Sequence, residues 1–404
     1  MTAGQSHDLK LPGSAQVIPA ALVSFLVLMF FFNIVSRLTV APLLPILEQE
    51  FQLRHGAAGS LYFFISLGYC AGLYVSGYVA CRLNHRVTIA VSSATIGGAL
   101  LASSWMPSLS GIRVSLILLG LGGGLYLPSG IAALTENTPQ GAWGRVLAIH
   151  ELGPNLAYVC APLLAECLLG FMPWRGVLGM LGSLALLFGL AFLLSGLGGS
   201  SQGRPPSPAT MRTIARDPAL WAMAGLFAVA IGVGLGLYTM LPLFLVNEVG
   251  LDRFSANLVT GLTRASALVS VFIAGILADR IGRTRTIAVS MAGAGGCTLA
   301  LGLAAHPWTS PPLIFLQAAF AAAVYPSAFA IIAALFPLPV RNVAVSMIMI
   351  VGVFVGAGVV PPAIGSLADR FSFSLAFGAG GMATLASLLL LRLLPPSSRP
   401  PHGA

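Results

Sequence analysis

Apolar residues along this chain fall in long runs rather than in the short alternating patterns of soluble helices and strands. A helix needs about 20 predominantly apolar residues to cross the hydrocarbon core of a bilayer. Runs of that length predict twelve transmembrane helices, most of them joined by short connections. The expected spans are residues 17–47, 57–80, 87–105, 113–134, 146–169, 177–197, 219–246, 254–278, 286–305, 313–336, 343–367 and 375–394.

One connection differs from the others in length and composition. Residues 198–218 are rich in Gly, Ser and Pro, and they divide the chain six spans from six. We therefore expect an all-α membrane protein with a six-helix bundle at 17–197 and a second at 219–394, arranged around a central cavity. The segments 1–16 and 395–404 are expected to be tails.

The composition supports a membrane protein and excludes other classes. Of 404 residues, 57% are hydrophobic and 8% are charged, whereas soluble globular domains carry about 25% charged residues. The charges are scattered singly, so we expect no nucleic-acid partner. Lipid and a small molecule are the expected partners of a monomeric chain. The cysteines form no CxxC pair, so no metal site built from them is expected. They are Cys70, Cys81, Cys160, Cys167 and Cys297. No other cofactor is expected.

The basic residues predict the orientation of the chain. The formal net charge is +9, and all but one of the twenty basic residues are Arg. Short loops rich in Arg and Lys face the cytoplasm. Cytoplasmic termini place thirteen basic residues inside: Lys10, Arg82, Arg86, Arg145, Arg204, Arg212, Arg216, Arg280, Arg283, Arg285, Arg341, Arg392 and Arg399. The outside then holds Arg54, Arg113, Arg175, Arg253 and Arg370. We expect a bacterial inner-membrane protein with both termini in the cytoplasm.

The two halves of the chain repeat each other. Gly77–Ser92 and Gly275–Ser290, which are 198 positions apart, are identical at eight of sixteen positions. An offset of 200 superposes Pro42 on Pro242. Duplicated helical units are typical of secondary transporters, whose binding sites lie between the repeats near the middle of the membrane.

The second copy of the repeat carries a recognisable loop. The run Gly275-x-x-x-Asp279-Arg280-x-Gly282-Arg283-x-Arg285 resembles the signature loop of the major facilitator superfamily, and Gly77 and Arg82 remain of the first copy. The resemblance implies two helical halves that rock against each other, with this loop as a gate. Asp279 is expected to pair with arginines or with a helix amino terminus in one arrangement of the halves. The alternative is that these charges only set the topology.

Two arginines lie inside predicted spans, where an ionisable group costs about 3 kcal/mol. Arg37 shares a helix face with Asn33, four residues before it. The run Arg37-x7-Pro45 followed by Glu50-Phe51 resembles in part the first span of the anion:cation symporter branch. This resemblance implies contact between Arg37 and a substrate carboxylate. Arg264 lies ten residues into span 8, where we also expect substrate contact. The alternatives are a side chain that reaches the interface for Arg37, and an ion pair with Glu151 or capping of freed carbonyls for Arg264.

A neighbouring pair and three tyrosines complete the candidate residues. His150 and Glu151 begin like the zinc signature HExxH, but Pro154 replaces its second histidine, so no metal site is expected. In a low-dielectric site the pair can exchange a proton near neutral pH, although it can also be a helix-start pair with Arg145. The tyrosines are expected either to hydrogen-bond a substrate or to satisfy one another; they are Tyr126, Tyr238 and Tyr325.

The sequence thus predicts a secondary-active transporter that moves a small, organic or inorganic anion with protons by alternating access. The alternative is a proton-driven exporter of drug-like or lipophilic compounds, favoured by the apolar lining. No nucleophile with a base and no metal cluster is placed at membrane depth, so neither a catalytic residue nor an enzyme is predicted. A ligand sensor on a transporter scaffold is a third class.

Overall fold

The computed structural model describes residues 19–198, 201–203 and 207–393. The predicted tails and part of the connection lie outside these residues, as do Lys10, Arg204 and Arg399. Throughout the described part of the chain the regular elements are helical.

The first half of the chain contains seven α-helices and one short 3₁₀ turn. They are α1 (Ala20–Leu38), α2 (Val40–Phe51), α3 (His55–Trp105), α4 (Leu109–Glu136), η1 (Gln140–Ala142), α5 (Trp143–His150), α6 (Leu152–Leu169) and α7 (Trp174–Ser195). The short helix α8 (Pro208–Ile214) lies in the connection between the halves.

The second half contains nine α-helices, two π-helical turns and a terminal 3₁₀ segment. They are α9 (Pro218–Ile231), the π turn η2 (Gly232–Gly236), α10 (Leu237–Asn247), α11 (Arg253–Thr263), α12 (Ala265–Ile281), α13 (Arg283–Leu303), α14 (Ser310–Leu335), α15 (Leu338–Val353), the π turn η3 (Phe354–Val359), α16 (Val360–Arg370), α17 (Phe373–Ala386) and η4 (Ser387–Leu393).

Within the described residues, eleven helical stretches are long and apolar enough to cross a membrane. One of them, α3, has 51 residues and would be about 75 Å long if straight, more than twice the hydrocarbon thickness. It turns back at Asn84, whose backbone is not helical (φ 68°, ψ 167°). Because α3 therefore crosses twice, the prediction of an all-α fold with twelve crossings is confirmed.

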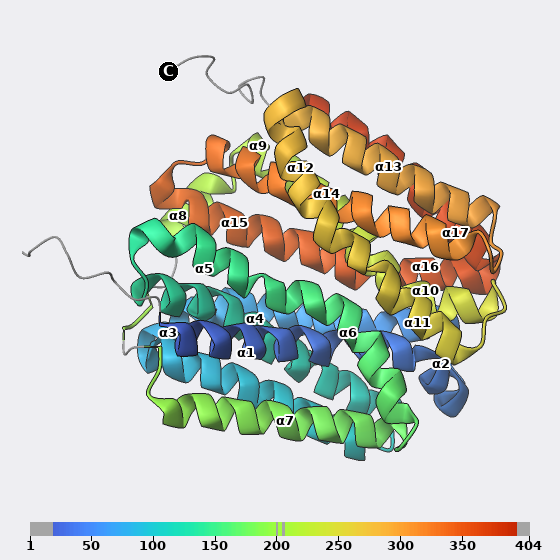
Figure 1. Cartoon of the computed structure of the whole chain (residues 1–404), viewed down its shortest axis with the longest axis horizontal. Helices are drawn as coiled ribbons and strands as arrows, with labels where there is room; N and C mark the ends of the chain where they lie inside the picture. Colours follow the sequence, from blue (N-terminus) through green and yellow to red (C-terminus); the bar gives the residue numbers. More distant parts are fainter. Residues whose placement is uncertain (1–18, 199–200, 204–206, 394–404) are drawn as a thin grey trace, which may run out of the picture.

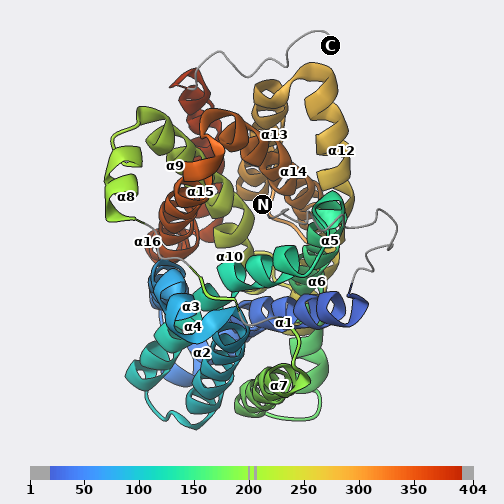
Figure 2. The ribbon, with the colours of Figure 1, turned by 90° about the vertical axis from the view of Figure 1, so that its left-hand side faces the viewer.

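The crossings run between two ends of the molecule (Figure 1). We call the end where the described chain starts at Ala20 and stops at Leu393 the termini end, and the opposite end, where α2 stops at Phe51, the far end. Figure 2 shows the molecule from the termini end, with the first-half helices α1 to α4 and α7 below and the second-half helices α9, α12, α13, α14 and α15 above. The packing repeats: α3 contacts α4 and α7, and α13 contacts α14 and α17.

The repeat extends to backbone geometry. Asn84 and Gly282, which are 198 positions apart, both turn the chain at the termini end with positive φ, 68° for Asn84 and 91° for Gly282. Their ψ angles are 167° and 149°, a region that glycine adopts and other residues enter only with strain. Asn84 compensates with its side chain, whose Oδ1 accepts the Val87 N–H at 2.9 Å.

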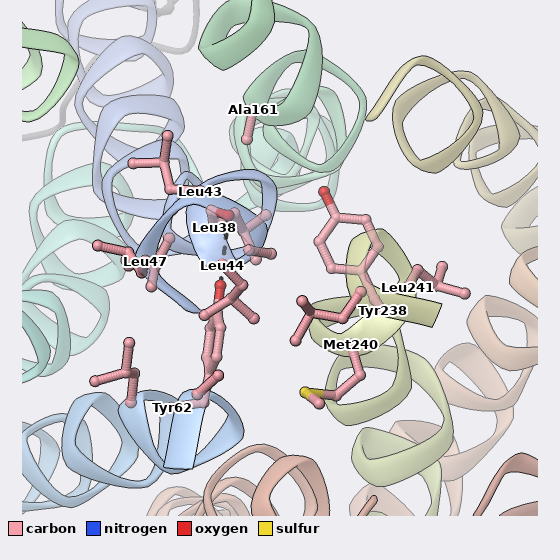
Figure 3. Packing of buried hydrophobic residues seen from close by; sticks show 14 of the residues in the cluster. Leu38, Leu43, Leu44, Leu47, Tyr62, Ala161, Tyr238, Met240 and Leu241 are labelled. Carbon is pink, nitrogen blue, oxygen red and sulfur yellow. Dashed lines mark hydrogen bonds between the residues drawn. The ribbon is translucent and has the colours of Figure 1, made fainter. Parts of the chain in front are cut away.

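Apolar packing joins the two halves in a cluster that extends toward the far end. Figure 3 shows leucines of α1 and α2 facing Tyr238, Met240 and Leu241 of α10, with Tyr62 of α3 beneath them. The Tyr62 hydroxyl lies 3.3 Å from the Arg37 carbonyl and 3.4 Å from the Leu38 carbonyl. The Leu38 carbonyl has no helical donor because Pro42 lacks an N–H. The break between α1 and α2 is therefore a satisfied feature of the core.

The strained turn generates a prediction about stability. Asn84→Ala keeps the strain and removes the hydrogen bond to Val87, so we expect the free energy of unfolding to fall by about 1 kcal/mol. Asn84→Gly loses the same bond but relieves the strain, so it stays close to wild type. Thermal unfolding in detergent measures both variants. An Asn84→Ala protein as stable as wild type would contradict this account.

Candidate functional site

Arg37 lies on α1 with its guanidinium turned into the first half of the molecule. Its Nη2 donates to Asn33 Oδ1 at 3.1 Å, and its Cζ lies 4.6 Å from the centre of the Tyr69 ring. Asn33 in turn donates from Nδ2 to the Gly123 carbonyl at 3.2 Å. The expected shared face of Asn33 and Arg37 is therefore present, and the cation is stacked on an aromatic ring.

A glycine of α4 makes room for this side chain. A Cβ atom at Gly123 would lie 3.1 Å from both Cδ and Nε of Arg37. The missing side chain lets Arg37 lie flat against α4, and its contacts hold it inside the bundle rather than at the membrane interface. Nη1 of Arg37 has no hydrogen-bond partner among the described residues.

Arg264 occupies the break between α11 and α12 and is 6% exposed. Its Nη2 donates to the carbonyl of Gly234. Its Cζ lies 4.5 Å from the ring centre of Tyr238 and 5.4 Å from that of Tyr158. Nε is buried and has no partner among the described residues. One nitrogen of the guanidinium therefore donates to a backbone carbonyl, and other N–H donors of the group have no described partner.

The carbonyl that Arg264 binds belongs to the π turn η2. A π turn leaves carbonyls outside the regular helical ladder, and in lipid such groups need partners from neighbouring helices. Gln317 of α14 donates from Nε2 to the adjacent Val233 carbonyl at 2.7 Å. Nη2 of Arg264 therefore caps one freed carbonyl, that of Gly234.

Both guanidinium groups lack an acidic partner. Among the described residues no carboxylate lies within 4.0 Å of either one, and Glu151 lies beside His150 instead. An ion pair between Glu151 and Arg264 is therefore absent from this structure. Two uncompensated cations, one from each half, remain in the interior.

Tyr158 of α6 is a residue that sequence reasoning missed. Its carbonyl accepts the Tyr238 hydroxyl at 2.9 Å, which joins the two halves. Its ring centre lies 5.4 Å from Cζ of Arg264. Its own hydroxyl has no described hydrogen bond. The only signal in the sequence was its spacing of seven residues, about two helical turns, from Glu151.

The three predicted tyrosines have different surroundings. The Tyr238 hydroxyl donates its hydrogen bond to the Tyr158 carbonyl. Tyr126 is 1% exposed. Its hydroxyl lies 2.6 Å from the Leu26 carbonyl and 3.0 Å from His150 Nε2. Tyr325 packs on Phe227 with 6.1 Å between ring centres, and its hydroxyl has no described partner. Of these three tyrosines and Tyr158, Tyr325 and Tyr158 have hydroxyl groups without a described hydrogen bond.

His150 and Glu151 point to different environments. His150 ends α5 and is 0% exposed, whereas the Glu151 side chain, in the break before α6, is 57% exposed. Their closest charged atoms, His150 Nδ1 and Glu151 Oε1, are 3.9 Å apart. His150 is the last residue of α5, and Glu151 is the single residue between α5 and α6.

The far end is closed by a carboxylate that crosses between the halves. Asp369 of α16 accepts the backbone N–H of His55 at 2.8 Å and that of Gly56 at 2.9 Å, which are the first N–H groups of α3. A carboxylate at a helix amino terminus is favoured by the helix dipole. A Cβ at Gly365 would lie 2.2 Å from the His55 carbonyl, so the two backbones are in contact.

A second carboxylate closes the far end between α6 and α11. Glu166 lies 2.9 Å from Arg253 Nε and accepts Asn257 Nδ2 at 2.7 Å. Asn257 Nδ2 also approaches the Pro42 carbonyl of α2 at 3.3 Å. We call Asp369 and Glu166, with these partners, the far-end latches.

The predicted gating loop lies at the opposite, termini end. Asp279 is exposed and has no described partner, and Arg283 donates to the Ala330 carbonyl at 3.3 Å. Arg280, Arg285 and Arg82 are exposed as well. Gly77 lies inside α3, seven residues before its turn at Asn84, and Gly275 lies inside α12, seven residues before Gly282. Among the residues that the structure describes, the carboxylate of the predicted gate therefore has no partner while the far-end latches are closed.

Comparison with known proteins identifies the family. The model of the Major Facilitator Superfamily matches residues 26–315 and 265–404. The chain belongs to the Major Facilitator Superfamily. It is therefore a multi-pass membrane transporter and not an enzyme, as predicted.

Individual relatives are distant. The "Probable nitrate transporter NarT" of Staphylococcus aureus (strain JH9) is 22% identical over 262 residues, covering 62% of this chain and 64% of that protein. A D-xylose-proton symporter structure superposes with a TM-score of 0.78 at 15% identity, over 95% of this chain and 99% of that one. A bacterial homolog of the human lysosomal transporter Spinster, in an inward-facing and occupied conformation, gives 0.74 at 16% identity, with 95% and 96% covered. These structures support the fold.

The latches generate a prediction about conformation. Asp369→Ala removes the carboxylate that joins α16 to α3, so we expect the far end to open more often. Spin labels at Arg54→Cys and Phe371→Cys, in a protein with the native cysteines replaced, should then report a larger share of long distances. Glu248→Gln is the matched control, because Glu248 accepts the Phe373 N–H at 3.2 Å within one half. Equal distance distributions for Asp369→Ala and wild type would show that the latch does not hold the end closed.

Proposed function

We propose that this superfamily transporter moves a small anion by alternating access, with Arg37 and Arg264 as the groups that bind it. The observation that carries the proposal is the pair of interior guanidinium groups with no described carboxylate within 4.0 Å. Charged groups at membrane depth normally pair with one another or mark a substrate pathway. A passing anion supplies the charge that the protein does not.

The free donors suit a planar anion. A guanidinium offers parallel N–H groups that match two oxygens of a carboxylate or of nitrate. Arg37 has Nη1 free, and Arg264 has Nε and Nη1 without described partners. Asn33 and the hydroxyls of Tyr158 and Tyr325 add neutral polar groups. The tyrosine rings stacked on both cations favour a flat ligand that continues the stack.

Nitrate is the substrate to test first. It is planar, carries one negative charge and is weakly hydrated, so it suits a largely aromatic and apolar site. The name of the NarT relative points to the same anion. Small carboxylates share the planar shape and are the second class to test, whereas phosphate and sulfate are tetrahedral and more strongly hydrated.

The distribution of charge supports cytoplasmic termini. Ten described arginines lie toward the termini end: Arg82, Arg86, Arg145, Arg212, Arg216, Arg280, Arg283, Arg285, Arg341 and Arg392. The far end has five, Arg54, Arg113, Arg175, Arg253 and Arg370. By the positive-inside rule, the termini end faces the cytoplasm of a bacterial inner membrane. In this structure the closed far end is then the outer one.

Alternating access follows from contacts that exist in only one state. The far-end latches hold the outer end closed, and the Asp279 loop is free to form its contacts when the cytoplasmic end closes. Each set of contacts biases a two-state equilibrium toward its own state. Protons are the coupling ion in this proposal, with His150 and Glu151 as the exchanging groups.

The arginines are tested by nitrate uptake into proteoliposomes. Arg37→Gln and Arg264→Gln each remove a charge-assisted contact, so we expect uptake at low nitrate to fall at least about tenfold. Arg113→Gln is the matched control, because Arg113 also stacks on an aromatic ring, with 5.4 Å to the centre of Phe64, but lies at the far end. It should transport like wild type.

The outcomes separate the two transporter classes. Wild-type uptake in both Arg37→Gln and Arg264→Gln would refute the anion proposal. Efflux of lipophilic cations from the same vesicles, unchanged by these substitutions, would favour the drug exporter instead. Size-exclusion profiles of each variant show whether a loss of uptake reflects misfolding.

A further inference from the structure

One face of α1 connects the arginine site to a buried histidine. Leu26, Phe30, Asn33 and Arg37 are spaced at four, three and four residues, which places them on the same side of the helix. The last two form the anion site described above. The first two contact the ring network around His150, about 10 Å along the helix from Arg37.

The hydrogen bonds define the tautomer of His150. The His150 ring stacks on Phe30 with 4.7 Å between centres, and its Nε2 lies 3.0 Å from the Tyr126 hydroxyl. That hydroxyl lies 2.6 Å from the Leu26 carbonyl. A carbonyl only accepts, so Tyr126 donates to Leu26 and its oxygen accepts the Nε2–H of His150. The proton of the neutral imidazole is therefore on Nε2.

The other ring nitrogen is left without a bond. Nδ1 of His150 is buried and has no hydrogen-bond partner among the described residues. In this tautomer it carries a lone pair, and Glu151 Oε1 stands 3.9 Å away. Two acceptors face each other there, and a proton added to Nδ1 converts the contact into a charge-assisted pair.

We propose that Nδ1 of His150 is the proton-binding site of this transporter and that proton and anion bind together. The inference rests on the proposed anion function. The Nδ1 lone pair takes a proton from a hydronium ion that reaches it past the exposed Glu151 carboxylate, leaving a water molecule. The imidazolium then pairs with Glu151 while Nε2–H keeps its bond to Tyr126. Release is the reverse step.

Few other charged groups face His150. Glu151 lies at the start of α6, Tyr126 comes from α4, and Arg145 is on α5 itself. On α1 the contacting residues Leu26 and Phe30 do not titrate, and η1 (Gln140–Ala142) carries no titratable side chain. Protonation of Nδ1 therefore adds a net positive charge to this region, with Glu151 as its single described counter-ion.

Two routes link that charge to the anion. The first is electrostatic, because a cation on the same face of α1 raises the positive potential at Arg37. The second is mechanical: Tyr126 and Gly123 lie one turn apart on α4, and Gly123 accepts Asn33 and supports Arg37. Both routes make the anion bind more tightly when His150 is protonated. Anion binding must then favour proton binding by the same factor, which is the coupling that symport of the two requires.

The inference is tested with purified protein in weakly buffered detergent, using nitrate as the probe. We expect nitrate to cause proton uptake and the nitrate Kd to fall several-fold between about pH 7 and about pH 4. His150→Gln keeps a donor for Tyr126 and cannot bind a proton, so both effects should vanish. In vesicles this variant should keep nitrate exchange between the two sides but lose accumulation driven by a pH gradient.

Two further variants keep the result interpretable. His85→Gln is the matched control, since His85 is also buried, approaches the Ser129 hydroxyl at 3.2 Å and lies 4.0 Å from Glu136. It should retain nitrate-linked proton uptake. Glu151→Gln removes the counter-ion and should weaken proton uptake even if His150→Gln fails to fold.

Each result has one meaning. Proton uptake that persists in His150→Gln, or that is unchanged in Glu151→Gln, overturns the assignment while leaving anion transport standing. A wild-type nitrate Kd that does not change with pH also overturns it. Wild type that binds neither nitrate nor small carboxylates overturns the proposed function and this inference together.

Discussion

Two positive charges held in an apolar interior without acidic partners are the constraint on which the rest of the structure depends. Arg264 is 6% exposed and Arg37 lies against α4, and both rest on tyrosine rings rather than on carboxylates. Burying an unpaired charge is costly. The aromatic faces, the amide of Asn33 and one backbone carbonyl reduce that cost while leaving donors for a ligand.

The helices that carry these charges are irregular at the same depth. The chain breaks between α1 and α2 near Arg37, and it breaks again at Arg264 between α11 and α12. In lipid every freed backbone group must find a partner. Tyr62 satisfies the carbonyl exposed by Pro42, and Gln317 with Arg264 satisfies the π turn η2. The site is therefore built where backbone irregularity and neighbouring side chains compensate each other.

The acidic residues that the interior lacks are used at the ends. Asp369 and Glu166 join the halves at the far end, where glycines let the backbones touch. Asp279, at the termini end, has no described partner in the same structure. Since the two ends must not be open at the same time during transport, carboxylates that bind in only one arrangement are suited to switching. Interior arginines and terminal carboxylates thus perform separate tasks.

The number of crossings, the internal repeat and the two interior arginines followed from the sequence alone. Each depends on local properties: runs of about 20 apolar residues, a turn shared by Asn84 and Gly282, and charges inside such runs. Tertiary structure alone decided the partners. Tyr158, Gln317 and Asp369 act on groups carried by helices distant in the chain, and the buried His150 diverges from the exposed Glu151 because their helices pack differently. Contacts between distant helices leave no periodic signal in one sequence, because they depend on how the helices pack in three dimensions.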